Sequence, residues 1–226
     1  MNEHTSKKFD AELEGIRTRV LQMGGMVELQ IVKAMEGLSD GDLLLIDQVI
    51  ENDNRVNHLE IELDEACNQI IAKRQPTAVD LRMISTVQKT ITDLERIGDE
   101  AKKIAKTAKQ LHTTGSNFTP QIRLAHIATA VVDMLRTSLD AYARLDTISA
   151  AQVVRQDKEV DAEFKGIMRQ LITYMMEDPR TISQSIELMF VAKSVERIGD
   201  HAKNIAEYVV YMVKGRDVRH TSLEEI

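Results

Sequence analysis

Two carboxylate pairs recur in this chain at the same spacing and in the same local sequence. Glu95 and Asp99 bound one ERIGD string, and Glu196 and Asp200 bound a second one 101 positions later. Residues four apart share one face of an α-helix, so each string places two carboxylates about one turn apart. Like charges at that spacing cost roughly 0.2–0.5 kcal/mol on an exposed helix. We therefore expect each pair to have a compensating partner.

Two further acids stand where the apolar pattern of the preceding helices asks for a hydrophobic residue. Asp53 lies in DNRVN (53–57) and Asp157 in DKEVD (157–161). A buried carboxylate needs a proton, a basic side chain or a metal ion. Carboxylate and amide oxygens suit hard cations such as magnesium, manganese, calcium or iron. The pattern predicts one oxygen-rich metal site in each half of the chain, with these ligands: Glu95, Asp99, Asp53 and Asn57; Glu196, Asp200, Asp157 and Asp161.

A solvated helix face is the competing interpretation of the ERIGD strings. Asp99 could pair with Lys102 or Lys103, and Asp200 with Lys203, at helical spacing. The competing interpretation of the two seam acids is a buried ion pair with an arginine such as Arg96 or Arg197. Both alternatives stay open at this point.

The elements that carry these acids follow from the hydrophobic periodicity. Apolar residues recur in steps of three and four and predict six helices, over about 9–39, 43–73, 77–111, 120–145, 150–177 and 181–214. The segment TTGSNFTP (113–120) is the clearest linker. Short loops and one-sided apolar stripes predict an all-α protein of two tandem, pseudo-symmetric, antiparallel three-helix bundles, residues 1–113 and 119–226. Gly24 and Gly25 in the first helix predict a close helix approach or a bend.

Composition narrows the functional classes. The net charge of −7 argues against nucleic acid as a main partner. The single cysteine, Cys67, fits a reducing compartment. The start MNEHTSKKFD is unlike a signal peptide, and no apolar run approaches the ~18 residues of a membrane span. We expect a cytoplasmic protein without a Gly-rich phosphate loop or a redox di-iron motif.

These residues resemble the PhoU family, whose members carry two three-helix repeats, each with an E(D)xxxD motif in its third helix. The resemblance covers nearly the whole chain and is carried by MGGMVE (23–28), DEACNQIIAKRQPTAVDLR (64–82), LERIGD (94–99), RQLITYMMED (169–178) and YVVYMVKGRDVRH (208–220). It implies a non-enzymatic negative regulator of phosphate uptake and of the phosphate-starvation (Pho) regulon. It also implies a homodimer that links PstB, the ATPase of the Pst phosphate transporter, to the sensor kinase PhoR.

The resemblance further implies bound metal, as iron or zinc clusters in some members, held by the repeated acidic motifs. Carried onto this chain, the ligands are Glu95, Asp99, Glu196 and Asp200, with Asp53, Asp157 and Asp161 as partners from the neighbouring helix. The first half has Asn57 where the second has Asp161, so we expect its site to be less anionic.

Two other functional classes compete with a regulatory adaptor. A metal store or a carboxylate–metal enzyme could use the same acidic stripes. A histidine phosphotransfer bundle would need an exposed, phosphorylatable histidine, and the candidates are His58, His126 and His201.

Overall fold

A computed structural model describes residues 7–113 and 122–217. Within these residues the chain forms six α-helices and one 3₁₀ turn, and no strand. The elements are α1 (Lys7–Asp40), α2 (Leu43–Arg74), α3 (Ala78–Thr113), α4 (Leu124–Arg144), α5 (Thr147–Glu177), η1 (Pro179–Thr181) and α6 (Ile182–Lys214). All six predicted helices are confirmed. Apart from Thr113, which ends α3, the predicted linker lies outside the described residues, so the domain bounds stay a prediction.

Matching caps begin the second helix of each half. Asp42 precedes α2, and its side chain accepts hydrogen bonds from the backbone N–H groups of Leu44 and Leu45. Asp146 does the same for Ile148 and Ser149 at the start of α5. An N-cap carboxylate satisfies backbone donors that the first turn leaves unpaired. The equal placement of the two caps shows that the halves repeat one local design.

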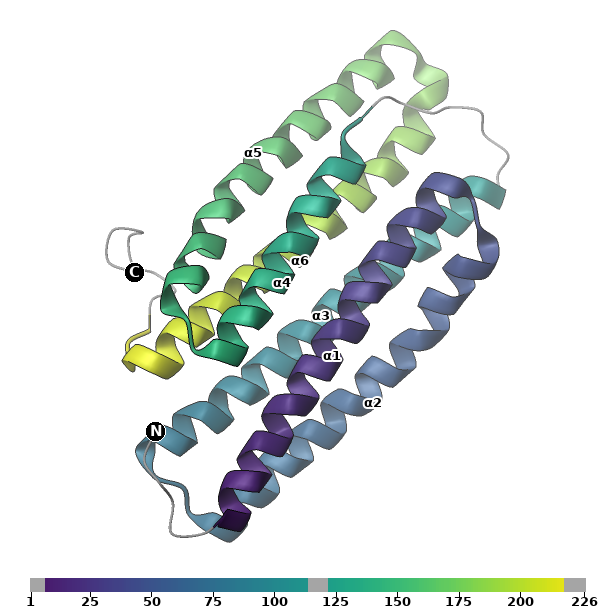
Figure 1. The fold of residues 1–226 in the computed structure, drawn as a ribbon. Coiled ribbons are helices and arrows are strands. Elements are labelled where there is room, and N and C mark those ends of the chain that lie inside the picture. Colours follow the sequence, from purple (N-terminus) through teal and green to yellow (C-terminus); the bar gives the residue numbers. More distant parts are fainter. Residues whose placement is uncertain (1–6, 114–121, 218–226) are drawn as a thin grey trace.

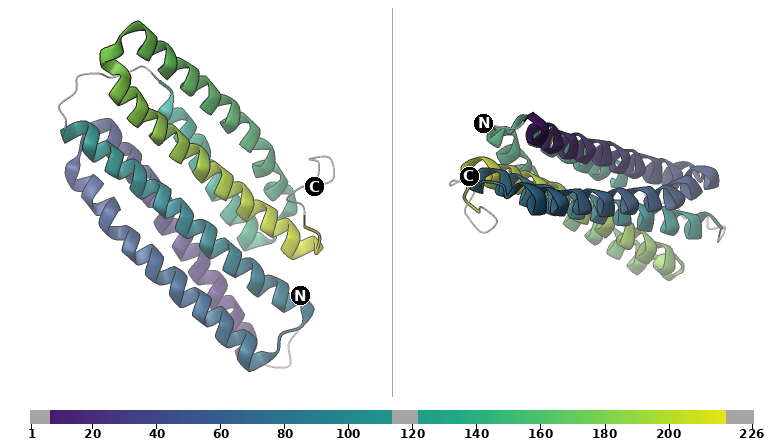
Figure 2. Two further views of the ribbon diagram at one scale, coloured as in Figure 1. Left: turned by 180° about the vertical axis from the view of Figure 1, so that it is seen from behind. Right: turned by 90° about the horizontal axis from the view of Figure 1, so that it is seen from below.

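The six helices form two antiparallel bundles that lie side by side (Figure 1). The view from behind shows α3 and α6 next to each other, with α2 and α5 on the outside (Figure 2, left). Helices α1 and α4 cover the other side of this four-helix layer and also contact each other. At 1.5 Å rise per residue the 36 residues of α3 span about 54 Å, so the grooves between helices are long.

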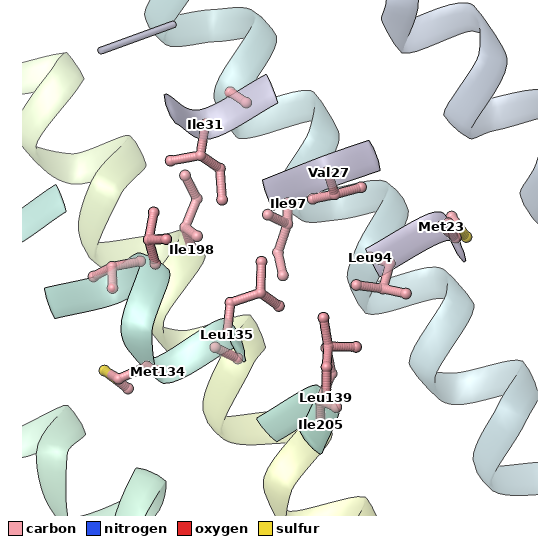
Figure 3. Packing of buried hydrophobic residues seen from close by; sticks show 14 of the residues in the cluster. Met23, Val27, Ile31, Leu94, Ile97, Met134, Leu135, Leu139, Ile198 and Ile205 are labelled. Atoms are coloured by element: carbon pink, nitrogen blue, oxygen red, sulfur yellow. The ribbon is translucent and has the colours of Figure 1, made fainter. Parts of the chain in front are cut away.

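Helices α3 and α6 are buried on two faces, which the apolar pattern did not predict. Besides the expected stripe, Ile97 and Ile104 of α3 and Ile198 and Ile205 of α6 are fully buried. Figure 3 shows Ile97, Ile198 and Leu135 pointing into a shared core between the halves. The two bundles therefore have one continuous hydrophobic core.

The close approach predicted at the glycine pair occurs at Gly24. A Cβ placed there would lie 2.5 Å from Leu139 Cδ1 of α4, so any larger side chain would have to displace Leu139. Gly25 has nothing within 4 Å of the same construction. The first glycine thus lets α4 of the second half pack against α1.

None of the described helices has an apolar stretch of the length needed to cross a membrane.

Candidate functional site

The first groove, between α2 and α3, holds a buried carboxylate paired with a lysine. Asp53 is 0% exposed, and Lys102 Nζ donates to its Oδ2 over 2.7 Å. Asn57 Nδ2 donates to the same oxygen over 3.4 Å. The competing interpretation is right that Asp53 forms a buried ion pair and wrong about its partner, because the exposed Arg96 guanidinium lies 3.6 Å from Glu95 instead.

The second groove, between α5 and α6, repeats this arrangement. Asp157 is buried, and Lys203 Nζ donates to its Oδ2 over 2.7 Å. Arg197, the other predicted arginine, pairs with Glu100 of the first half at 3.0 Å. A lysine thus neutralises the seam carboxylate in both halves, because it stands three residues after the ERIGD aspartate and faces the neighbouring helix.

The ERIGD carboxylates gather beside these pairs. Three of the four are half-buried: Glu95, Asp99 and Asp200. Two further predicted ligands, Asn57 and Asp161 of the preceding helices, are half-buried as well. Glu196 is buried and pairs with Lys193 on its own helix.

The electrostatics of the grooves confirm that the acids share one region. Burial raises the pKa of Glu95, and the charge of Asp99 raises it further, with smaller contributions from Glu60 and Asp53. Burial also raises the pKa of Asp200, assisted by Glu196 and Asp157. The hydrogen bond to Asp53 raises the pKa of Lys102 above its ordinary value. Each groove is therefore an anionic cluster with a lysine ammonium inside it.

The first groove also contains oxygens that lack a hydrogen-bond partner. Within the described residues, Asp53 Oδ1, Asn57 Oδ1 and both polar atoms of the Gln30 side chain are buried and unpaired. A Cβ built on Gly98 would lie 3.3 Å from Gln30 Oε1 and 3.4 Å from Asp53 Oδ1, so these oxygens surround the glycine. Unpaired buried polar atoms cost about 1–3 kcal/mol each. The first groove is thus under-satisfied as it stands.

This donor set fits a hard cation if the lysine moves away. The oxygens are carboxylates and amides, which suit magnesium, manganese or iron better than zinc, since zinc sites draw mainly on Cys and His. In the described part of the chain, no three His, Cys, Asp or Glu side chains converge closely enough to hold a metal. The metal site in each half therefore stays a prediction, and Lys102 and Lys203 neutralise the buried aspartates in this conformation.

The two grooves differ beneath the repeated glycine. Gly98 faces Gln30 and Asp53, whereas Gly199 faces the side chains of Val131, Val160 and Met134. Met134 stands 104 positions after Gln30, at the equivalent place in α4. The unpaired amide is therefore specific to the first half.

A polar cluster between α3 and α6 was missed by sequence reasoning. His201 Nδ1 lies 2.6 Å from Asp93 Oδ1, and Asn204 Nδ2 donates to the same oxygen over 3.1 Å. Ser194 Oγ donates to Glu100 Oε2 over 2.8 Å. Position 194 is the repeat equivalent of 93, and position 201 that of 100, so the two contacts are related by the internal pseudo-symmetry. They tie the halves together, and the burial of Asp93 and Glu100 on the second stripe is the signal that could have revealed them.

The other two candidate histidines lie on the surface. His58 is 3.0 Å from Glu62 on its own helix, and His126 Nδ1 is 2.8 Å from Glu163 of α5. Among the three candidates for phosphotransfer, His201 is the one engaged in the contact between the halves.

Comparison with known proteins follows the internal repeat. The model of the PhoU domain matches residues 20–108 and again residues 124–209. The phosphate-specific transport system accessory protein PhoU homolog of Pseudomonas aeruginosa is 48% identical over 223 residues, 99% of this chain and 92% of the relative. PhoU of Escherichia coli is 48% identical over 227 residues, 100% of this chain and 93% of the relative. The crystal structure of PhoU from Pseudomonas aeruginosa superposes with a TM-score of 0.89 and covers 92% of this chain and 100% of that one. Two matched domains and full-length relatives lead to one conclusion: this chain belongs to the PhoU family.

Proposed function

We propose that this chain is a negative regulator of phosphate uptake and of the phosphate-starvation regulon. It acts as a cytoplasmic adaptor between PstB, the ATPase of the phosphate transporter, and the sensor kinase PhoR, and it works as a homodimer. The observation that carries the proposal is the full-length similarity to accessory proteins of the phosphate-specific transport system. Membership of the family supports a role in phosphate transport, and the binding of PstB and PhoR is what we propose in addition.

The geometry supports an adaptor. Six long helices expose extended faces on both bundles, and the shared core holds the bundles in a fixed arrangement (Figure 1). Two partners can then bind to different helices of one rigid body. Such a body transmits the presence of one partner to the other only through small shifts of packed helices.

We further propose that each acidic groove binds a divalent cation. In the first groove the ligands are Asp53, Asn57, Glu95 and Asp99, and the support is the pair of unpaired oxygens on Asp53 and Asn57. In the second groove the ligands are Asp157, Asp161, Glu196 and Asp200. The cation would supply the positive charge that Lys102 and Lys203 supply here, and it would satisfy oxygens that the lysines do not reach.

Co-purification tests the adaptor role. The tagged chain is mixed at high phosphate with purified PstB and, separately, with the cytoplasmic part of PhoR. Association with both partners is expected, and the absence of any association refutes the proposal. The double variant Glu95→Ala, Asp99→Ala is compared with Glu51→Ala, Glu65→Ala, which removes two exposed acids of α2. If the first variant loses metal but both variants bind PstB and PhoR as the wild type does, the groove is not part of the regulatory surface.

A metal store or carboxylate–metal enzyme is the second candidate, and the unpaired oxygens of the first groove favour it. The two candidates differ in stoichiometry. We expect a regulator to take up a fixed number of ions per groove whatever the supply, whereas a store should take up more as the supply rises. Metal analysis after dialysis against manganese or iron(II) distinguishes them.

A further inference from the structure

The outer side of α5 and α6 carries an exposed apolar surface near their connecting turn. Ile172 and Met176 of α5 and Ile182, Ile186 and Phe190 of α6 are all exposed, Met176 by 81% and Phe190 by 61%. We call these five residues the apolar face. The residues of each set are four apart in sequence, so they lie along one side of their helix. Contiguous apolar surface of this kind on a folded protein marks an interaction site more often than chance exposure.

The two rows of the apolar face lie on neighbouring antiparallel helices. α5 and α6 are joined by the short turn Pro179–Thr181 and lie side by side in both views (Figures 1 and 2). Farther from the turn, the Lys193 ammonium is 5.5 Å from the centre of the Phe164 ring, so the facing positions of the two helices meet there. From Phe164 to Met176 this stretch of α5 is about 18 Å long at 1.5 Å per residue. That length matches three to four turns of a helix.

The first half of the chain shows that the fold does not require this surface to be apolar. The repeat offset is 104 for α2 and α5 and 101 for α3 and α6. The equivalent positions in the first half are mostly polar or small, and they are these: Asn68, Ala72, Leu81, Ser85 and Lys89.

In the first half, hydrogen bonds join the facing positions of α2 and α3. Gln88 Nε2 donates to Asp64 Oδ1 over 2.8 Å, and Thr92 Oγ1 donates to Glu60 over 3.4 Å. The equivalent positions of the second half are Met168, Met189, Phe164 and Lys193, so the same backbone carries a polar seam in one half and a mainly apolar one in the other. The difference is a property of the sequence of α5 and α6 and not of the bundle.

The charges beside the apolar face indicate what covers it. Lys165 and Arg169 stand seven and three residues before Ile172, so they lie on the same side of α5. Both are exposed, and neither forms an ion pair with another residue in the described part of the chain. Two acids of the same helices are engaged elsewhere: Glu163 contacts His126, and Glu187 accepts from Gln110.

We propose that the apolar face docks an amphipathic helix of a partner protein, with acidic side chains along the edge that meets Lys165 and Arg169. An apolar helix face in a groove between two helices is a common recognition mode. Met176 of the apolar face and Met168 beside it have adaptable side chains that can repack around a ligand. The docked helix would lie against the second bundle as its fourth helix. This inference goes beyond the proposed function, because it concerns the exposed apolar residues near the turn and not the carboxylates of the acidic clusters, and its test contains no phosphate-system protein.

The test uses variants taken from the chain's own first half. The docking variant is Ile172→Asn, Met176→Ala, Ile186→Ser, Phe190→Lys, four exchanges that install the equivalent residues. The matched control removes exposed apolar side chains elsewhere, Leu29→Ser with Leu44→Ser, which are 54% and 78% exposed. The probe is a fluorescent synthetic helix of about 18 residues with leucines on one face and glutamates along its edges, and a second peptide carries lysines in place of the glutamates.

The acidic peptide is expected to bind the wild type and the control equally. Its binding to the docking variant should be weaker by roughly tenfold or more, and the lysine peptide should bind the wild type more weakly by a similar factor. Lys165→Glu with Arg169→Glu should reverse the preference between the peptides. If circular dichroism shows that the docking variant has lost its helices, Phe190→Lys alone carries the same comparison.

Four results would overturn the proposal. These are equal binding of the acidic peptide to wild type and docking variant, no binding of it to the wild type, self-association of the wild type that the docking variant abolishes, and binding to phosphatidylglycerol vesicles that the docking variant abolishes. The third result would assign the face to a second copy of this chain, and the fourth to a lipid surface.

Discussion

Replacing Lys102 by methionine tests how far the first groove depends on its internal cation. Lys102 Nζ is 2.7 Å from Asp53 Oδ2, and Asp53 is completely buried. Methionine keeps most of the apolar stem and removes the charge. The substitution leaves an uncompensated carboxylate in the core, which is the costly way to break a buried ion pair.

The size of the effect follows from burial. Two unit charges 2.7 Å apart interact by about 6 kcal/mol at an effective dielectric constant of 20, before the cost of desolvation is counted. Breaking a buried pair typically costs about 3–5 kcal/mol. The Lys102 side chain is 25% exposed, which brings water close to the carboxylate once the lysine is gone. We therefore expect Lys102→Met to lower the free energy of unfolding by about 3 kcal/mol, at the lower end of that range.

Urea denaturation followed by circular dichroism at neutral pH measures this loss. Adding Asp53→Asn to Lys102→Met should restore most of it, because a neutral amide replaces the stranded charge at nearly constant volume. Lys106→Met, an exposed change one turn along α3, is the control and should stay within about 0.5 kcal/mol of the wild type.

Divalent manganese provides a second measurement on the same variant. With the ammonium removed, the oxygens of Asp53, Asn57, Glu95 and Asp99 are free to hold a cation. A ligand at 100 times its dissociation constant stabilises the folded state by about 2.7 kcal/mol. Manganese should thus stabilise Lys102→Met more than the wild type. A loss below about 1 kcal/mol without metal, or no recovery on adding Asp53→Asn, would refute the reasoning.

Four further outcomes are expected from single sites. Gly24→Ala should destabilise the protein by about 1 kcal/mol, because the new methyl group meets Leu139; Gly25→Ala, with open space, should stabilise it by up to about 1 kcal/mol in the same thermal melts. Burial raises the pKa of Cys67 to about 12, so a thiol reagent at pH 8 should react with the unfolded chain and leave the native one unmodified, and fast native labelling would contradict this. Glu95→Gln should raise metal-free stability at pH 7 by about 0.5 kcal/mol. The pKa of Glu95 is raised by burial and by its acidic neighbours. Between the unfolded and the folded pKa, the folded chain therefore holds a proton that the unfolded chain has released, and the free energy of unfolding falls as pH rises through that window. The variant should lack this decline.

The helices and their buried stripes were predictable because each stripe repeats with the period of a helix. Val20, Met23 and Val27 in α1 illustrate a pattern that has no other reading over so many turns. The second buried stripe of α3 and α6 was missed although Ile97 and Ile104 are apolar. One apolar stripe is enough to pack a helix into a three-helix bundle. A second stripe indicates an interior helix only when a further helix is known to cover it. Whether the two halves meet, and along which helix faces, is decided by packing between segments that are far apart in sequence.

The site shows the same division between local and long-range information. The burial of Asp53 and Asp157 followed from their place in the apolar stripe. Their partners did not, because the register between antiparallel helices decides whether Arg96 or Lys102 reaches the carboxylate. Arg96 is closer to Glu95 in sequence and points to solvent, whereas Lys102, six residues on, lies opposite Asp53.

The internal repeat separates what the bundle needs from what each half adds. Both halves keep a buried aspartate paired with a lysine, Asp53 with Lys102 and Asp157 with Lys203. Apolar residues of similar volume would stabilise a bundle as well or better than such a pair, so stability alone does not explain its presence twice. The cation site that we propose would explain it, with the lysine holding the carboxylates in place until a divalent ion replaces it. Where the halves diverge, at Gln30 opposite Met134 and along the apolar face, they have no shared structural requirement to meet, and these are the positions at which the two bundles are free to take on different partners.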